Sequence, residues 1–263
     1  MNDAKKELLI GLQSLLKYHN EIGISHYPRN DAVESFLRVE PPVPRDVQEA
    51  RLTPVTRIQP TPVKKNPVIK KSPVKPAEIA EEVATCRACD LHKQRIYPVA
   101  GHGSDKIRLL IVGDWLSANS QGDLPPGHLF GVKQDQMLNK MLLAINLSAS
   151  DVFITNVIKC AVPDSCQPQA THVQSCVSFL RRQIVALLPE VICTMGMVAA
   201  RAVLEKSQPL SRLRGQFHEY EVEKGLTVPV IATYHPTYLL QNPEMKQATW
   251  TDLQLLAKKM SLK

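Results

Sequence analysis

Four cysteines are spaced along the chain so that they could hold one metal centre. Cys86 and Cys89 are three residues apart, and both thiols can reach one centre from a single turn of chain, while Cys160 and Cys176 stand alone farther along. Four thiolates suit either a tetrahedral zinc ion or an iron–sulfur cluster. Buried free thiols are the alternative, because one Cys-x-x-Cys pair without a second close pair is a weak signal.

Three other side chains could act on an organic ligand. Asn156 lies in an apolar segment, where a carboxamide needs hydrogen-bond partners. It either ties neighbouring loops together or reads the edge of a ligand. His235, followed by Pro236, is either a loop histidine with satisfied hydrogen bonds or a catalytic donor. Phe130, in a glycine-containing loop, either anchors that loop or offers a surface on which a flat ligand stacks.

The segments that carry these side chains alternate between apolar strands and helices. Buried parallel strands are predicted at residues 107–113, 152–159, 190–196 and 228–233. Helices are predicted at residues 77–85, 134–145, 169–187, 197–205 and 245–260. This alternation predicts an α/β fold with three layers, αβα, around a central four-stranded parallel sheet. Ligands of such folds bind beyond the carboxyl ends of the strands, where Gly113, Asp114, Asn156 and His235 stand.

The first 76 residues differ in composition from the rest of the chain. Residues 3–19 carry leucines at helical spacing, which predicts a helix whose apolar face needs a partner, either the main domain or another protein. Residues 41–76 hold nine of the 20 prolines and eight Lys/Arg against two acidic residues, a net charge of +6. We therefore expect a disordered N-terminal extension with a helix (1–40), an extended basic linker (41–76) and a folded domain (77–263).

The composition also limits where the protein works. The chain has six cysteines and no secretory signal, which favours a reducing compartment in which thiols bind metal or pack in the core. No apolar run approaches the roughly 20 residues that a membrane helix needs. We expect a soluble, cytoplasmic protein that does not bind a membrane and is a monomer.

The order of motifs along residues 80–260 resembles the uracil-DNA glycosylase superfamily, most closely its family 4, the iron–sulfur group. The motifs are CRACDLHKQR at 86–95, VAGHGS at 99–104, LLIVGD at 109–114, LF at 129–130, VFITNVIKC at 152–160, the QPQA…SC segment at 167–176, VICTMG at 191–196, LRGQF at 213–217, YHPTYLLQNP at 234–243 and WTDL at 250–253. By this resemblance a structural [4Fe–4S] cluster, with zinc as the alternative, would be held by Cys86, Cys89, Cys160 and Cys176.

The resemblance implies hydrolysis of the N-glycosidic bond of deoxyuridine in DNA, with release of uracil. Asn156 would bind the O4 and N3 edge of uracil, and cytosine presents the opposite donors and acceptors there. Phe130 would stack on the base after the base leaves the DNA helix. His235 would donate to O2, where negative charge gathers as the bond breaks. Residues 238–240 would press into the gap left by the base.

The first motif of this family is altered in the chain. The family has Gly-Glu followed by small residues, whereas this sequence reads Gly113-Asp114-Trp115. Asp114 would position water or the loop, and Gly113 and Trp115 would line the base site. The alteration leaves two alternative functions open. One is a weakly active or inactive DNA-binding module on the same fold, and the other is a glycosylase for another deaminated base.

Overall fold

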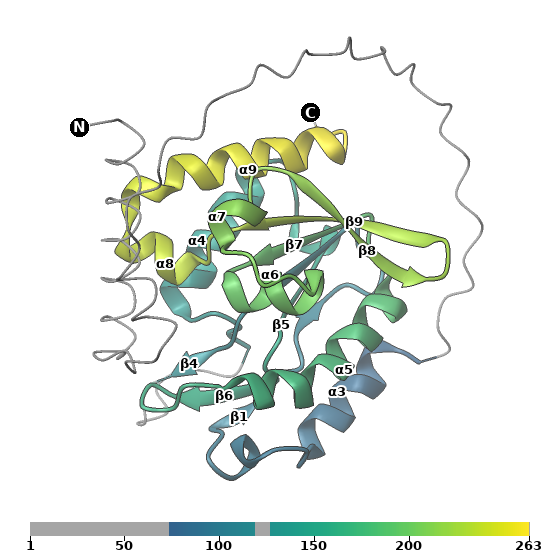
Figure 1. The fold of residues 1–263 in the computed structure, drawn as a ribbon, viewed down its shortest axis with the longest axis vertical. Coiled ribbons are helices and arrows are strands. Elements are labelled where there is room, and N and C mark those ends of the chain that lie inside the picture. Colours follow the sequence, from purple (N-terminus) through teal and green to yellow (C-terminus); the bar gives the residue numbers. More distant parts are fainter. Residues whose placement is uncertain (1–73, 119–126, 263) are drawn as a thin grey trace, which may run out of the picture. The chain divides into compact units, whose positions relative to one another are not determined.

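A computed structural model describes residues 74–118 and 127–262 of the chain, within one compact unit that spans residues 66–263 (Figure 1). The predicted helix at 3–19, the extension 1–40 and nearly all of the linker 41–76 lie outside the described residues. Within the described part of the chain, no helix combines the length and the apolar character that crossing a membrane requires.

A six-stranded sheet forms the centre of the domain, in the order β2-β5-β3-β7-β9-β8. Its parallel centre consists of β5 (Val152–Asn156), β3 (Leu109–Gly113), β7 (Val191–Met195) and β9 (Leu226–Thr233). Antiparallel edges are added by β2 (His102–Gly103) and β8 (Phe217–Glu223). The four predicted parallel strands are confirmed. The observed sheet has six strands, however, two more than the prediction gave. A two-residue strand has no readable pattern, and β8 alternates between half-buried and exposed residues instead of forming an apolar run.

Strand β5 is shorter than the predicted segment 152–159, and the difference matters for the site. The chain leaves the sheet after Asn156, where the Val157 N–H donates to the Gly113 carbonyl at 2.9 Å. It then enters β6 (Cys160–Pro163), which forms a small second sheet with β1 (Tyr97–Pro98) and β4 (Ser117–Ala118). Asn156 is therefore the last residue of its strand, and Cys160 begins the next one.

Helices cover both faces of the large sheet, as the three-layer prediction required (Figure 1). Alternate residues of β3 point to opposite faces: Leu109 and Ile111 belong to one apolar cluster, and Leu110 and Val112 belong to the other. The first face packs against α4 (Val132–Ala144) and α9 (Lys246–Lys259). The second packs against α5 (Ala170–Leu187), α6 (Met197–Leu204) and α7 (Leu210–Leu213). Helix α3 (Pro76–Thr85) packs on α5 through Ile79 and Val83, and an exposed ion pair between Glu82 and Arg182 also joins the two helices.

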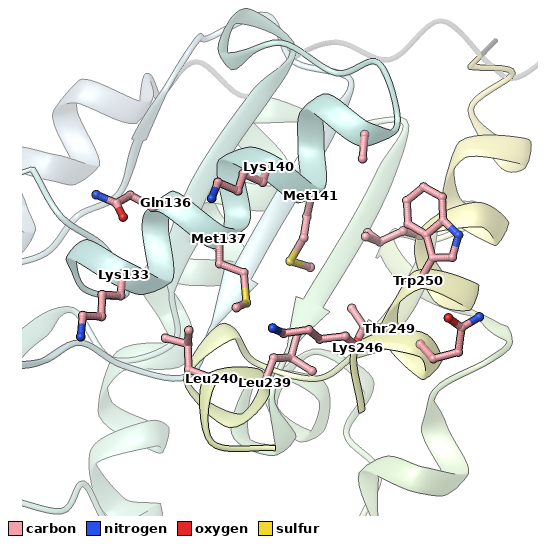
Figure 2. A pocket seen from close by; sticks show the side chains of 13 residues that line it. Lys133, Gln136, Met137, Lys140, Met141, Leu239, Leu240, Lys246, Thr249 and Trp250 are labelled. Carbon is pink, nitrogen blue, oxygen red and sulfur yellow. The ribbon is translucent and has the colours of Figure 1, made fainter. Parts of the chain in front are cut away.

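A groove of about 720 Å³ runs between α4 on one side and α8 (Pro236–Gln241) and α9 on the other (Figure 2). Its lining is apolar, with Met137, Met141 and Trp250, and its charged residues are lysines. Leu239, in α8, is buried with 1 % of its surface exposed, whereas Leu240 is 38 % exposed. Of the two leucines predicted to enter DNA, only Leu240 is therefore accessible as the chain stands.

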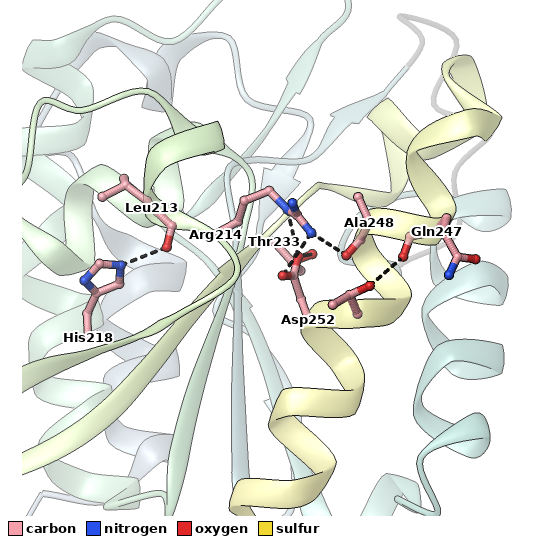
Figure 3. Close-up of polar contacts among 8 residues, drawn as sticks. Leu213, Arg214, His218, Thr233, Gln247, Ala248 and Asp252 are labelled. Carbon is pink, nitrogen blue, oxygen red and sulfur yellow. Dashed lines mark hydrogen bonds and ion pairs between the residues drawn. The ribbon is translucent and has the colours of Figure 1, made fainter.

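The carboxyl end of β9 is held by a buried ion pair between Arg214 and Asp252 (Figure 3). Asp252 is 1 % exposed, and its Oδ2 atom also accepts from the Thr233 hydroxyl at 2.7 Å. The Arg214 guanidinium donates to the Ala248 carbonyl of α9 and lies over the Tyr234 ring, 5.4 Å from its centroid. One ion pair thus connects α9, the segment before β8 and the residue next to His235.

We expect the substitution Asp252→Ala to lower the free energy of unfolding by about 3–5 kcal/mol, because it leaves the Arg214 cation in a partly buried site without its partner. Urea denaturation followed by circular dichroism measures this change. Arg181→Ala is the matched control, since Arg181 and Glu205 form a pair with side chains 54 % and 68 % exposed. Its cost should stay below about 1 kcal/mol. Equal effects of the two substitutions would contradict this interpretation.

Candidate functional site

The parallel strands end at the same level and bring their last residues side by side. Gly113 is in register with Asn156 on one side and with Met195 on the other, and Met195 is in register with Thr233. Tyr234 and His235 follow directly after Thr233. The hydrogen-bonded register of the sheet therefore gathers Gly113, Asn156 and His235 at one edge.

Gly113 is the point where two candidate side chains meet. A Cβ atom at Gly113 would overlap the Phe130 ring and lie 2.5 Å from the Asn156 Oδ1 atom. Glycine is thus required here by space, and its missing side chain is what lets Phe130 and Asn156 approach each other. Phe130 is 3 % exposed and also contacts His235, with ring centroids 4.7 Å apart and planes tilted by 56°.

The Phe130 loop is held by Asp135, a residue that the sequence reasoning missed. The Asp135 carboxylate accepts from the backbone N–H of Phe130 at 3.0 Å, from that of Leu129 at 3.2 Å and from the His128 ring at 2.8 Å. Asp135 lies in the first turn of α4, where negative charge is favourable. The sequence signal for this contact is an acidic residue four positions after Gly131, which can accept from backbone N–H groups that precede the helix.

The Asn156 carboxamide is buried with one atom left unpaired. Its Nδ2 donates to the Leu129 carbonyl at 2.6 Å, and the side chain is fully buried. Its Oδ1 atom has no hydrogen-bond partner in the structure. Because buried polar atoms are nearly always paired, this acceptor is available for a donor on a ligand. The second N–H of the same amide remains available as a donor beside it.

His235 presents a second unpaired polar atom next to Phe130. It is the N-cap of α8, and its Nδ1 atom accepts from the Thr237 N–H at 3.2 Å. Its Nε2 atom is buried without a partner. Burial lowers the pKa of His235 to about 4, so the ring is neutral at pH 7. Since Nδ1 accepts, the single proton of the neutral ring is on Nε2, which makes that atom a donor.

Asp114 and Trp115 make their contacts with other residues. The Asp114 Oδ1 atom accepts from the Ala199 N–H in the first turn of α6 at 2.7 Å. Burial raises the pKa of Asp114 to about 7. A Cβ atom at Gly196 would overlap the Asp114 carboxylate. Trp115 packs instead in an apolar cluster with Leu91 and Ile158, beside the cysteines.

The four predicted ligands Cys86, Cys89, Cys160 and Cys176 line one small cavity of about 10 Å³. They come from the end of α3, the segment after it, β6 and α5. Arg95 lies beside them, with Nη1 3.9 Å from the Cys160 Sγ atom. Burial raises the pKa of Cys176 to about 11. Across the described residues, no three His, Cys, Asp or Glu side chains are arranged to hold a single metal ion.

The two remaining cysteines lie outside the cavity lining. Cys193 is in the middle of β7 within the sheet core, and burial raises its pKa to about 12. Cys166 is half-buried in the apolar cluster that also contains Trp115. Both thiols therefore act as packing residues.

Comparison with known proteins gives the same family throughout. A family model described as the uracil DNA glycosylase superfamily matches residues 100–254. A type-4 uracil-DNA glycosylase of Archaeoglobus fulgidus is 35 % identical over 180 residues, which cover 66 % of this chain and 88 % of that protein. A type-4 enzyme of Pyrobaculum aerophilum is 31 % identical over 180 residues, covering 67 % and 90 %.

A match of smaller coverage comes from another type within this family. A type-5 uracil-DNA glycosylase of Pyrobaculum aerophilum is 32 % identical over 159 residues, covering 55 % of this chain and 68 % of that protein. The type-4 proteins thus match a larger share of both chains. With the family model covering the sheet, Phe130, Asn156 and His235, the chain belongs to the uracil DNA glycosylase superfamily.

Proposed function

We propose that this protein is a uracil-DNA glycosylase, which hydrolyses the N-glycosidic bond of deoxyuridine in DNA and releases uracil. One observation carries the proposal: two buried polar atoms, Asn156 Oδ1 and His235 Nε2, have no partner among the residues that the structure describes, and both residues adjoin Phe130. The type-4 relatives, which carry this activity in their names, support the same function.

The unpaired atoms match the edges of uracil. The Asn156 Oδ1 atom accepts from the N3–H of uracil, and its free N–H donates to O4. Cytosine has an acceptor at N3 and a donor at C4, so the same amide would face two mismatched pairs. Because Nδ2 is already bonded to Leu129, the amide cannot rotate to suit cytosine without losing that bond.

The His235 side chain acts on the bond that breaks. Uracil must leave the DNA helix before its N1–C1′ bond is accessible, and Phe130 gives the base an aromatic surface to stack on. As the bond breaks, negative charge accumulates on the O2 atom of uracil, and the neutral His235 ring donates its Nε2–H to that atom. A donor fixed in advance at developing charge stabilises the transition state more than the substrate.

We also propose that the cysteine cavity holds a [4Fe–4S] cluster. Its four thiols surround a cavity whose lining has no carboxylate. A zinc ion, the alternative, needs all four sulfur atoms about 2.3 Å from one point, whereas a cluster distributes its ligands over separate iron atoms. When bound, the cluster supplies a cross-link between the segment after α3, β6 and α5, and the chemical step stays with Asn156, Phe130 and His235.

We propose that Asp114 is a positioning residue, whose carboxylate holds the loop after β3 against α6. Its bond to the Ala199 N–H occupies the carboxylate at a helix terminus, in contact with Gly196. Because the carboxylate is occupied in this way, the structure also favours a second candidate function, a DNA-binding module on this fold without glycosylase chemistry. Uracil release by the wild-type protein and by His235→Ala separates the two functions.

The substitution His235→Ala should lower the rate of uracil release by a factor of about 10²–10³, because it removes one hydrogen-bond donor to the leaving base. The assay is strand breakage by alkali in an oligonucleotide with a single deoxyuridine, next to matched cytosine and thymine oligonucleotides. His102→Ala is the control, since His102 is exposed on the edge strand β2. A wild-type protein that binds the oligonucleotide but breaks no strand would support the binding module instead.

Removing one predicted ligand by Cys176→Ser should abolish iron binding, because the cavity then lacks one of four thiolates. Wild-type protein purified without oxygen should contain iron and acid-labile sulfide in equal amounts, measured by colorimetric analysis. The control is Cys193→Ala, which removes a thiol of the sheet core and should keep both. Zinc without sulfide in the wild-type protein would contradict the cluster.

The raised pKa of Asp114 makes stability depend on pH. The folded protein binds this proton with a pKa of about 7, against an ordinary value of 3.8. Folding is therefore favoured at low pH, and this contribution is lost as pH rises from about 4 to about 7, by at most about 1.4 kcal/mol per pH unit. Asp114→Asn should flatten this slope in urea denaturation measured across that range.

The same variant tests the role of Asp114 in the reaction. An asparagine oxygen can still accept from the Ala199 N–H, so a residue that only positions the loop should keep most of the excision rate in Asp114→Asn. Loss of uracil release at every pH, with the fold intact, would assign the chemistry to the carboxylate instead.

A further inference from the structure

Lys159 lies between the cysteine cavity and the Asn156 site. It is 2 % exposed, and its ammonium group donates to three oxygen atoms: the Asn156 carbonyl at 2.7 Å, the Thr155 hydroxyl at 2.7 Å and the Gln183 Oε1 atom at 2.6 Å. All three donors of the ammonium group are thus used. Two of the three acceptors belong to the last two residues of β5.

The contacts of Lys159 extend to other parts of the fold. Gln183, on α5, is 1 % exposed and donates through Nε2 to the Ala100 carbonyl at 2.6 Å. The Thr155 hydroxyl lies 3.2 Å from both that carbonyl and the Gln183 Oε1 atom. The network therefore fixes the end of β5 against α5 and the loop before β2. It holds Asn156 from its backbone side, while Leu129 holds its side chain.

None of the ion pairs among the described residues includes Lys159, so its charge has no carboxylate partner there. A buried cation with neutral partners alone is costly. Lys159 lines the cavity together with Cys160 and Cys176. Four thiolates in that cavity would supply the negative charge that the ammonium group lacks.

We propose that Lys159 is a positioning residue that connects the two sites: its ammonium group anchors the backbone of Asn156 and neutralises charge at the cysteine cavity. The anchoring role rests on the proposed function, because it matters only if Asn156 binds the base. The charge role does not, since it concerns the thiolates alone. One side chain then makes the position of the base-reading amide depend on an intact cavity.

Two variants separate these roles. Lys159→Met keeps a side chain of similar length but removes both the charge and the three hydrogen bonds. Thr155→Val removes one acceptor and keeps the charge. Three measurements apply to each variant: uracil release per bound cluster, amide hydrogen exchange of residues 155–158, and the rate at which a chelator removes iron.

We expect Lys159→Met to lower uracil release per cluster roughly tenfold or more, since small displacements of a binding group are costly. Amide exchange at residues 155–158 and iron loss to the chelator should both become faster. Thr155→Val should also lower uracil release and speed amide exchange, but it should leave the rate of iron loss unchanged because the charge remains.

Several results would overturn the proposal. Unchanged exchange and unchanged release per cluster in Lys159→Met would remove the anchoring role, and equal iron loss in both variants would remove the charge role. If Lys159→Met does not fold, Thr155→Val decides, and normal uracil release in that variant counts against the proposal. A wild-type protein without uracil release would refute the proposed function, while exchange and iron loss would still test Lys159.

Discussion

The arrangement of the site depends on the absence of a side chain at Gly113. Phe130 comes from the loop before α4 and Asn156 from the end of β5. The two side chains meet in the volume that a Cβ atom at Gly113 would fill. The parallel register of β5, β3 and β7 puts Gly113 between its neighbours, so the space opens at the sheet edge where β9 delivers His235. Any larger residue at this position would separate the aromatic ring from the amide.

Burying the unpaired Asn156 Oδ1 and His235 Nε2 atoms costs free energy of folding. The hydrogen bonds of the neighbouring residues offset this cost. Asp135 fixes the loop of Phe130 through two backbone N–H groups, and Leu129 in that loop fixes Asn156. On the other flank, the Arg214–Asp252 pair holds the end of β9. Satisfied hydrogen bonds thus surround the two atoms that are not satisfied and hold the residues that carry them in place.

Sequence patterns predicted the elements whose signal is local. Strands β3 and β7 are continuous apolar runs, and α5 has a clear helical period, so their positions follow from the residues alone. The end of β5 at Asn156 could not be read, because the apolar pattern continues through Ile158. Asp135 and Gln183 act through contacts that only the folded chain creates, and Trp115 packs beside the cysteines for the same reason.

The neutral state of His235 has a consequence for the reaction cycle. With a pKa of about 4, this ring keeps the same proton throughout the neutral range. In the proposed reaction it lends a hydrogen bond without giving the proton away, so uracil departs as an anion and the enzyme has no proton to recover before its next substrate. A residue usually chosen for its ability to titrate would here be useful because it does not.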